Sequence, residues 1–508
     1  MSSGNVSPSE FWSSLSQRTK AIGAAAIGAA AIVAGVYVWT KTRTPCPALS
    51  DCGSRDTSRD ASLFPTLVQL DSALEDLHEM FVMTREEMEK TASGMQSAMV
   101  SGLQPASDSS LKMLPTYVDK LTVNAQGQVV IALDMGGTNL RVMKVQIKPG
   151  GHAVILGVNK HSIPQQYMIG SGSALFDFIA HCVIEAIGDS EGDIPLGFAF
   201  SFPTLQEAIN RGKLVEWTKG FAASDVEGRD VAELLNASFK AAGKNIQVTA
   251  LVNDTVGTMM TGAFATQDEN TLIGLILGTG SNACYVEKAE NIVKWKGAPI
   301  ESGHMVINIE WGAFDSPVFS TLPHNKFDIE LDETSLNPRK QHFEKMISGM
   351  YLGELARLVL QEYCAEINLF GGQTSSNINT HYTFGTHFMS QIESDNTPDL
   401  AGVSAVLKSI GIASSTLPVR RFVKVVCNLV AVRSARLAAA GLGAIIRQLG
   451  RINKPVTVAI DGSVFELYPG YQDAMRNALI ELGFHSVTLT LAKDGSGLGA
   501  ALTAAIMT

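Results

Sequence analysis

The stretch Leu-Val-Asn-Asp-Thr-Val-Gly-Thr at residues 251–258 places a carboxamide and a carboxylate side by side at the end of an apolar run. A buried carboxylate costs several kcal/mol unless it is paired or hydrogen-bonded, so Asp254 needs a structural or a chemical role. Taken alone, Asp254 is explained as a cap on the next helix. Two more stretches favour chemistry, because Asp-Met-Gly-Gly-Thr-Asn at 134–139 and Gly-Thr-Gly-Ser-Asn at 278–282 also follow apolar runs. Together the three stretches indicate phosphoryl transfer from ATP.

Gly-rich turns with hydroxyl side chains occur four times, at 136–138, 278–281, 461–463 and 494–499. Glycine lets the backbone approach a ligand closely, so that N–H groups and hydroxyls can bind phosphate oxygens. Each turn alone is explained by tight-turn geometry, and the second also fits a loose dinucleotide pattern. Four in one chain favour phosphate binding. The G-x-x-x-x-G-K-[ST] pattern is absent from the sequence, which argues against a P-loop NTPase.

Four acidic residues are candidates for the chemistry. Asp134 and Asp254 are the two carboxylates that phosphoryl transfer needs, one for a metal and one as base. Mg²⁺ retains most of its waters and needs few protein carboxylates. Glu310 lies between apolar neighbours and suits a grip on two vicinal sugar hydroxyls. Glu344, taken alone, is better explained as part of a solvated helix face.

Length and composition limit the class of protein. The 508 residues suggest two or three lobes, and 45% hydrophobic with 17% charged residues is the range of a globular enzyme. The net charge of −10 argues against nucleic acid as a partner. The six cysteines form no CxxC pair, which argues against zinc and favours a reducing compartment. A lumenal glycan on the sequon at Asn253 would cover the proposed site, which also favours the cytosol.

The N-terminus contains an uncharged segment at 21–39, which as a helix would reach roughly 28 Å, about one hydrocarbon thickness. The Ser/Gly/Asp-rich residues 40–62 resemble a flexible linker, so a buried Ala-rich helix is the weaker explanation. A cleaved secretory signal is also weaker, because the segment before the apolar run is long. We expect an uncleaved membrane anchor, with a plastid transit peptide as the alternative.

Apolar runs that alternate with helical segments indicate α/β layers. An amphipathic helix is predicted from Pro65 to Met88, because apolar residues recur there at spacings of three and four. A strand, a Gly/Thr turn and a returning strand occur twice, over 128–145 and 271–286, which indicates a weak internal duplication. Residues 370–400 predict an irregular insertion. The other predicted elements are strands at 194–200, 246–252, 456–460 and 487–491, a helix at 422–449 and a loop at 101–110.

From about Leu63 to Thr508 the chain resembles the eukaryotic hexokinases of the actin-like ATPase superfamily. The resemblance rests on motifs that occur in the family's order, and the anchor and the stretch 347–354 look most like plant-type members. The motifs are Met-Leu-Pro-Thr-Tyr-Val at 113–118, the phosphate strand 133–142, Leu-Gly-Phe-Ala-Phe-Ser-Phe-Pro at 196–203, Trp-Thr-Lys-Gly-Phe at 217–221, the Asn253-Asp254 stretch, Leu-Gly-Thr-Gly at 277–280, residues 308–314, 461–463 and 494–497.

The resemblance implies a two-lobed ribonuclease H-like α/β fold with a sugar and ATP cleft between a small and a large domain. It implies ATP-dependent phosphorylation of glucose and other hexoses at the 6-hydroxyl, the first step of glycolysis, with Mg²⁺ accompanying ATP. We expect a monomer on the cytosolic face of a membrane, the mitochondrial outer membrane before a plastid. The expected segments are 1–20, an anchor at 21–39, a linker at 40–62, an opening helical part of the large lobe at 63–112, a small domain at 113–253, and a large domain at 254–508 whose last helix returns to the small domain.

The resemblance also assigns residue roles. Asp254 would be the base, Lys219 would stabilise developing negative charge, and Asp134 would hold Mg²⁺ through water. The hexose would be bound by Ser201, Thr218, Lys219, Asn253, Asp254, Asn282, Glu310 and Glu344. The nucleotide would be bound by Gly136, Gly137, Thr138, Asn139, Gly278, Thr279, Gly280, Gly462, Ser463, Gly495 and Ser496.

Two alternatives and one departure qualify this assignment. A catalytically weak sugar sensor or scaffold would have degraded site residues, whereas these are intact. A dehydrogenase would need an acidic ribose-binding residue after the second strand, and Glu301 lies in a Pro/Gly-rich segment. The chain departs from the family at Arg339, where members commonly have glycine, so we expect an effect on the local turn near Glu344.

Overall fold

The computed structural model describes residues 63–119, 128–136, 139–148, 152–188, 194–373 and 375–507. The predicted anchor at 21–39, with the segments 1–20 and 40–62, lies outside these residues. Gly137 and Thr138 of the predicted phosphate loop also lie outside them.

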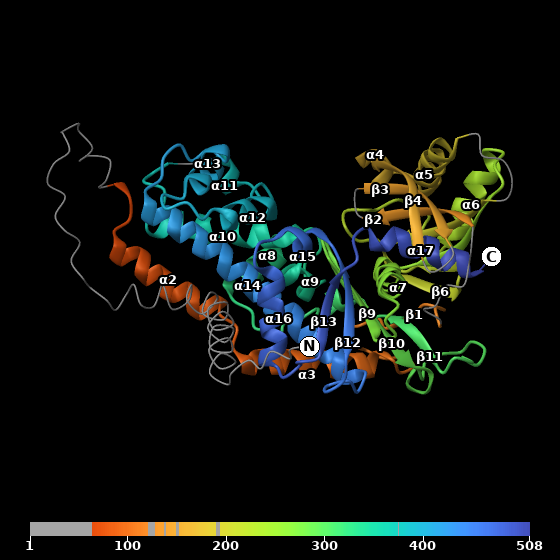
Figure 1. Cartoon of the computed structure of the whole chain (residues 1–508). Coiled ribbons are helices and arrows are strands. Elements are labelled where there is room, and N and C mark those ends of the chain that lie inside the picture. Colours follow the sequence, from red (N-terminus) through yellow and green to blue (C-terminus); the bar gives the residue numbers. More distant parts are fainter. Residues whose placement is uncertain are drawn as a thin grey trace, which may run out of the picture. The chain divides into compact units, whose positions relative to one another are not determined.

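The first of two main sheets has five strands in the order β4-β3-β2-β5-β8. Figure 1 labels its strands β2, β3 and β4. β2, β3 and β4 are antiparallel neighbours, whereas β2, β5 and β8 run parallel. β2 is buried along almost its whole length, which explains its continuous apolar sequence. The strands are β2 (Val129–Gly136), β3 (Asn139–Lys148), β4 (His152–Ser162), β5 (Ile194–Phe200) and β8 (Ile246–Val252).

The second sheet has six strands in the order β1-β11-β10-β9-β12-β13. From β11 to β13 the strand order and directions repeat those of the first sheet. β11, β10 and β9 are antiparallel neighbours, whereas β9, β12 and β13 run parallel. The predicted internal duplication is therefore confirmed as a repeat of topology. The strands are β1 (Leu114–Pro115), β9 (Thr271–Leu277), β10 (Ser281–Lys288), β11 (His304–Asn308), β12 (Val456–Asp461) and β13 (Val487–Leu491).

Helices cover both faces of the five-stranded sheet. α5 (Gly172–Ile187) and α6 (Val231–Ala241) pack on one face, and α17 (Gly495–Met507) packs on the other. α17 also crosses α7 (Asp254–Thr266) at very short range: a Cβ on Gly499 would meet the backbone of Gly257. The last helix thus lies against strands encoded more than 300 residues earlier, as the resemblance implied.

The longest helix, α14 (Leu417–Gln448), is the one helix among the described residues that is long and apolar enough to cross a membrane. Its most apolar window is 89% buried inside the fold, as in the core helix of a soluble protein. It packs among other helices of the six-stranded half. These are α2 (Leu67–Phe81), α3 (Arg85–Gly102), α8 (Lys326–Thr334), α9 (His342–Ile347), α10 (Gly349–Glu366), α12 (Thr386–Ser394), α13 (Ala401–Ser409) and α16 (Tyr471–Glu481).

The structure corrects two sequence predictions. The helix predicted over 65–88 is two helices, because α2 ends at Phe81 and α3 begins at Arg85. Thr84 starts the second helix with a capping box, in which its hydroxyl accepts from the backbone N–H of Glu87. The insertion at 370–400 is only partly irregular, since it contains α11 (Ser376–Asn379) and α12. The apolar spacing continues across the break between the two helices, whereas the cap at Thr84 determines where the second helix begins.

Candidate active site

The end of β8 and the start of α7 place two predicted sugar ligands next to each other. Asn253 is the N-cap of α7, and its side-chain oxygen accepts from the backbone N–H and the hydroxyl of Thr255 at 3.0 and 2.6 Å. Asp254 is the first helical residue, and one oxygen accepts from the Thr255 N–H at 2.9 Å. Both side chains are buried. A carboxylate at a helix N-terminus interacts favourably with the helix dipole and the free N–H groups of the first turn.

Amide side chains connect Asn253 with the second sheet. The Asn282 amide nitrogen lies 3.3 Å from the Asn253 side-chain oxygen, 2.8 Å from that of Asn308 and 3.2 Å from Glu310 Oε1. The Asn308 amide also donates to Glu310 Oε1 at 2.8 Å. β10 and β11 are paired neighbours, so the sheet itself brings Asn282 and Asn308 together. The Asn282 and Asn308 amides both orient the Glu310 carboxylate, which can accept hydrogen bonds from hydroxyls.

Two of the predicted sugar residues have uncommon backbone conformations. Glu310 has φ 58° and Lys219 has φ 57°, both in the left-handed region that side-chain-bearing residues rarely adopt. Such strain costs about 1–3 kcal/mol at each residue and is typical of functional sites. The Lys219 Nζ donates to the backbone oxygen of Ser201 at 2.8 Å, which ties this residue to the end of β5.

Three acids and one lysine come together at the centre of the site. Burial raises the pKa of Glu344, while the charge of Lys219 opposes the shift, and Glu310 and Asp254 add to it. Burial also raises the pKa of Glu310, opposed by the charge of Lys112 and the Asn308 hydrogen bond. A Cβ on Gly280 would lie 2.7 Å from Glu344 Oε2 and 3.4 Å from Lys219 Cε, so both side chains reach the same point.

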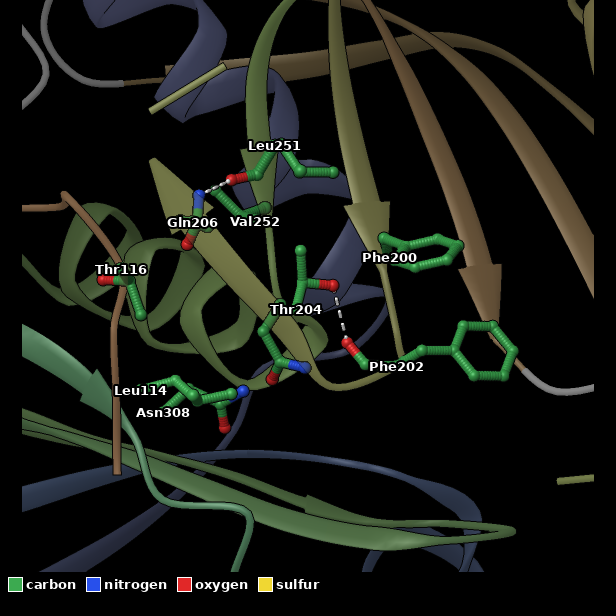
Figure 2. Close-up of a pocket in the computed structure, with 10 residues that line it drawn as sticks. Leu114, Thr116, Phe200, Phe202, Thr204, Gln206, Leu251, Val252 and Asn308 are labelled. Atoms are coloured by element: carbon green, nitrogen blue, oxygen red, sulfur yellow. Dashed lines mark hydrogen bonds between the residues drawn. The ribbon is translucent and has the colours of Figure 1, made fainter. Parts of the chain in front are cut away.

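A small cavity lies beside this network (Figure 2). It is bordered by Asn253 and Asn308, and its volume is about 10 Å³. That volume holds about one water molecule, so the cavity is not the hexose site. At its edge the Gln206 amide donates to the backbone oxygen of Leu251 at 2.7 Å, and this bond steadies the end of β8 immediately before Asn253.

Asp134 lies at the end of β2 on the predicted nucleotide side. Its Oδ2 accepts from the Ser496 hydroxyl at 2.8 Å and pairs with Arg141 at 2.8 Å. Burial raises the pKa of Asp134, which the Arg141 charge and the Ser496 hydrogen bond oppose, and Asp254 is near enough to contribute to the increase. Asp134 is thus a buried carboxylate within electrostatic range of the predicted base.

The donor set suits Mg²⁺ bound mainly through water and phosphate. Among the described residues, no group of three or more His, Cys, Asp or Glu side chains is arranged to enclose a metal ion. Asp134 offers one carboxylate, and Asp254 lies nearby. In phosphoryl-transfer sites Mg²⁺ is usually bound by only one or two protein carboxylates, together with waters and phosphate oxygens. The residues present therefore fit a water-mediated ion.

The Gly-rich turns meet one another behind Asp134. The Asp461 carboxylate accepts from the N–H of Gly462 at 2.8 Å and from that of Gly495 at 2.9 Å, so two turns share one acceptor. Gly462 has φ 125°, and a Cβ there would collide with the backbone of Leu277. Only glycine fits this position, where the third turn packs against the second.

The structure brings together the described residues that were predicted. Thr218 lies next to Lys219, and Gly136 and Asn139 close the β2–β3 hairpin. Thr279 and Ser463 are exposed, as phosphate-facing hydroxyls at the rim would be. The expected effect of Arg339 is small: it adopts φ 64°, its N–H donates to both Asp332 oxygens at 3.0 Å, and Glu344 still accepts from the Ser281 N–H at 2.9 Å.

Three residues of the site were not predicted. Asn308 orients Glu310, and its signal was its place two residues earlier in the same motif. Arg141 lies opposite Asp134 in the hairpin register, which could have been counted from the Gly-Gly turn. Asp461 connects two turns, and burial raises its pKa to about 6. Sequence reasoning had quoted this residue but assigned a role only to the glycine and serine after it.

Comparisons with known proteins agree with this geometry. Two family models, both described as hexokinase, match residues 73–264 and 272–506. Hexokinase-3 from Oryza sativa subsp. japonica is 41% identical over 440 residues, covering 82% of this chain and 87% of that protein. Hexokinase-1 from Spinacia oleracea is 43% identical over 441 residues, with 82% and 87% covered.

Solved structures agree as well. A hexokinase from Schistosoma mansoni complexed with glucose matches with a TM-score of 0.80 and 35% identity, covering 88% of this chain and 99% of that one. A second hexokinase crystal structure matches with a TM-score of 0.71 and 30% identity, covering 87% and 100%. The two-lobed actin-like ATPase fold predicted from the motifs is thereby confirmed.

Proposed function

Because the chain belongs to the hexokinase family and is an ATP-dependent sugar kinase, we propose that its main substrate is glucose, phosphorylated at the 6-hydroxyl. The observation that carries this proposal is the meeting of Asp254, Glu310 and Glu344 around Lys219. Carboxylates that accept from adjacent hydroxyls suit a hexose. The solved relative from Schistosoma mansoni was complexed with glucose, which supports the choice of sugar.

In the proposed reaction Asp254 takes the proton of the 6-hydroxyl as the oxygen attacks the γ-phosphorus of ATP, while the bond from that phosphorus to the β–γ bridging oxygen breaks and ADP leaves. Lys219 stabilises the negative charge that develops in the transition state. Glu310 and Glu344, oriented by Asn308 and the Ser281 N–H, hold the ring hydroxyls so that the 6-oxygen faces the nucleotide. Mg²⁺ would neutralise phosphate charge, held by Asp134 through water.

A coupled assay that measures glucose 6-phosphate formation by the full chain with glucose, ATP and Mg²⁺ tests the proposal. We expect robust turnover that Asp254→Ala lowers by about 100-fold or more. Glucose binding without any turnover in the wild type would contradict the reaction and favour the sensor or scaffold alternative. Equal turnover with another hexose and little with glucose would contradict the substrate.

We further infer that residues 21–39 anchor the enzyme to the cytosolic face of the mitochondrial outer membrane, where its product would enter glycolysis. The uncharged segment and the linker that follows it support this location. Protease treatment of intact organelles should remove the catalytic part. Protection of the whole protein inside plastids would contradict the anchor and favour the transit peptide.

A further inference from the structure

Glu216 is held by two lysines from different parts of the fold. Its Oε1 lies 2.6 Å from the Nζ of Lys112, and its Oε2 lies 3.0 Å from the Nζ of Lys340. The Glu216 side chain is 34% exposed, against 24% for Lys112 and 66% for Lys340. Burial would raise the pKa of Glu216, but the hydrogen bonds and charges of the two lysines more than offset this and lower it. Glu216 is therefore an anion shared by two cations.

The three residues stand next to predicted sugar ligands. Glu216 precedes Thr218 and Lys219 in the segment after β7 (Arg211–Leu214). Lys340 precedes Glu344 by four positions on the other side of the site. Lys112 is the leading charge that opposes the burial-driven rise in the pKa of Glu310. The two ion pairs thus join the segment that bears Lys219 to the segments beside both ring-binding acids.

Hydrogen bonds and ring stacking fix the segment after Glu216, so a displacement of Glu216 also displaces Lys219. The backbone N–H of Trp217 donates to Glu227 at 2.8 Å, and its indole N–H donates to the Ala223 oxygen at 2.9 Å. The Trp217 ring stacks on Phe221 at 5.2 Å between centroids. Thr218 and Lys219 lie between these two rings in the sequence and have little freedom to move independently of Glu216.

We propose that Glu216 is a positioning residue for hexose binding, which holds the Thr218–Lys219 segment against the Glu310 and Glu344 side through Lys112 and Lys340. The proposal rests on the proposed function of the site. Glu216 contacts neither the base nor Asp134, so its loss acts through the Thr218–Lys219 segment. It weakens glucose binding and, because Lys219 stabilises the transition state, it lowers kcat as well.

Partly exposed ion pairs are modest in strength, and two of them shift an equilibrium by about 3- to 10-fold. Glu216→Gln removes both pairs and should raise the glucose Kd, measured by calorimetry without nucleotide, by that factor. Lys340→Gln removes one pair and should raise the Kd by about 2- to 3-fold. The double variant should bind no more weakly than Glu216→Gln alone, because the Lys340 contact no longer exists there.

The hairpin formed by β6 (Thr204–Ala208) and β7 offers a matched control. Lys213 pairs with Glu207 at 2.6 Å on the same hairpin, but both residues belong to that hairpin and do not reach the other side of the site. Lys213→Gln should leave the glucose Kd unchanged. High salt should bring the wild-type Kd toward that of Glu216→Gln, because exposed ion pairs are screened.

An unchanged Kd in a folded Glu216→Gln would overturn the proposal, and so would fully additive effects of Glu216→Gln and Lys340→Gln. If Glu216→Gln did not fold, Lys340→Gln at an exposed lysine would decide in its place, with no change in Kd counting against the proposal. If the wild type binds glucose without turnover, the proposed reaction is rejected. The positioning role of Glu216 can still be tested in that case, because calorimetry measures the glucose Kd without turnover. A wild type that binds no glucose would reject both.

Discussion

The carboxylate of the buried Asp254 accepts a hydrogen bond from the N–H of Thr255, whereas Asn253, Asn282 and Glu310 form a hydrogen-bond network of their own. We therefore expect Asp254→Ala to lower kcat by about 100- to 10,000-fold, the usual contribution of a general base. The glucose Kd, measured by calorimetry, should change much less. Asp473→Ala, at a 77% exposed side chain on α16, is the control. Equal loss of binding and turnover would contradict the role of base.

Glucose binding should weaken in acid at a higher pH than ordinary glutamates would cause. Burial raises the pKa of both Glu310 and Glu344 above the usual 4.5, so each takes up a proton early as the pH falls. A protonated carboxyl loses acceptor capacity for vicinal hydroxyls. The effect on stability has the opposite direction. Because the folded state binds these protons more readily than the unfolded chain, the contribution of the two groups to the free energy of unfolding increases as the pH falls.

Calorimetric titrations of glucose between about pH 8 and about pH 5, without nucleotide, test this expectation. A parallel thermal melt at each pH separates weaker binding from unfolding. An affinity that stays flat until the range of an ordinary glutamate would show that the two acids are not protonated early or do not bind the sugar.

At the residue scale, sequence reasoning succeeded where a motif names a residue type and failed where a partner comes from elsewhere. Asp254 and Glu310 could be predicted because an acid in an apolar run needs a role, whereas the role of Asn253 came from the family resemblance. The ion pair of Lys340 with Glu216 could not be predicted, because 124 positions separate them and no motif connects them. The expected effect of Arg339 was overstated, since its left-handed backbone is held by Asp332.

At the scale of elements, the capping box at Thr84 sets the start of α3, and its removal should be measurable. Thr84→Ala removes the hydroxyl that accepts from the Glu87 N–H at 3.2 Å and donates to the Glu87 carboxylate at 2.8 Å, while the backbone N–H of residue 84 still donates to that carboxylate. We expect a loss of about 1 kcal/mol in the free energy of unfolding, measured with urea. Thr334→Ala, at the exposed end of α8, should be nearly neutral, and an equal loss there would argue against the cap.

Strands were predicted more closely than helices in this chain. β5, β8, β9 and β13 begin and end where the predicted strands do. β5 and β9 are mostly buried and read as continuous apolar sequence, whereas β13 has no fully buried residue and alternates Val and Leu with Thr. The predicted helix over 65–88 failed because its apolar spacing continued across a break that local side-chain hydrogen bonds impose. Helix boundaries depend on such caps, which periodicity does not detect.

At the scale of the whole molecule, the repeated sheet topology explains why the site residues come from distant parts of the sequence. β2–β3 and β9–β10 are equivalent antiparallel pairs, and in the sequence a Gly-rich stretch joins the two strands of each pair. The turn at 136–138 and the turn at 278–281 could be predicted as a pair for this reason. The contact of Ser496 with Asp134 depends instead on the return of α17, which only the family resemblance implied.

The predicted anchor can be separated from catalysis, because every residue assigned to the hexose or the nucleotide lies between Asp134 and Ser496. Replacing Ile27 and Ile32 with arginine in the full chain places two charges in the uncharged segment, at a cost of about 2.5–3.5 kcal/mol each near the centre of a bilayer. We expect the variant to leave the membrane fraction while kcat and the KM for glucose stay within about twofold of wild type, as for changes far from a site. Fractionation and the coupled assay measure the two effects.

Replacing Ser2 and Ser3 with arginine, outside the apolar segment, is the control that should remain membrane-bound. A double-arginine variant that stays in the membrane fraction would show that another part of the chain holds it there. One that leaves the membrane and also loses turnover would show that the segment contributes to the catalytic fold.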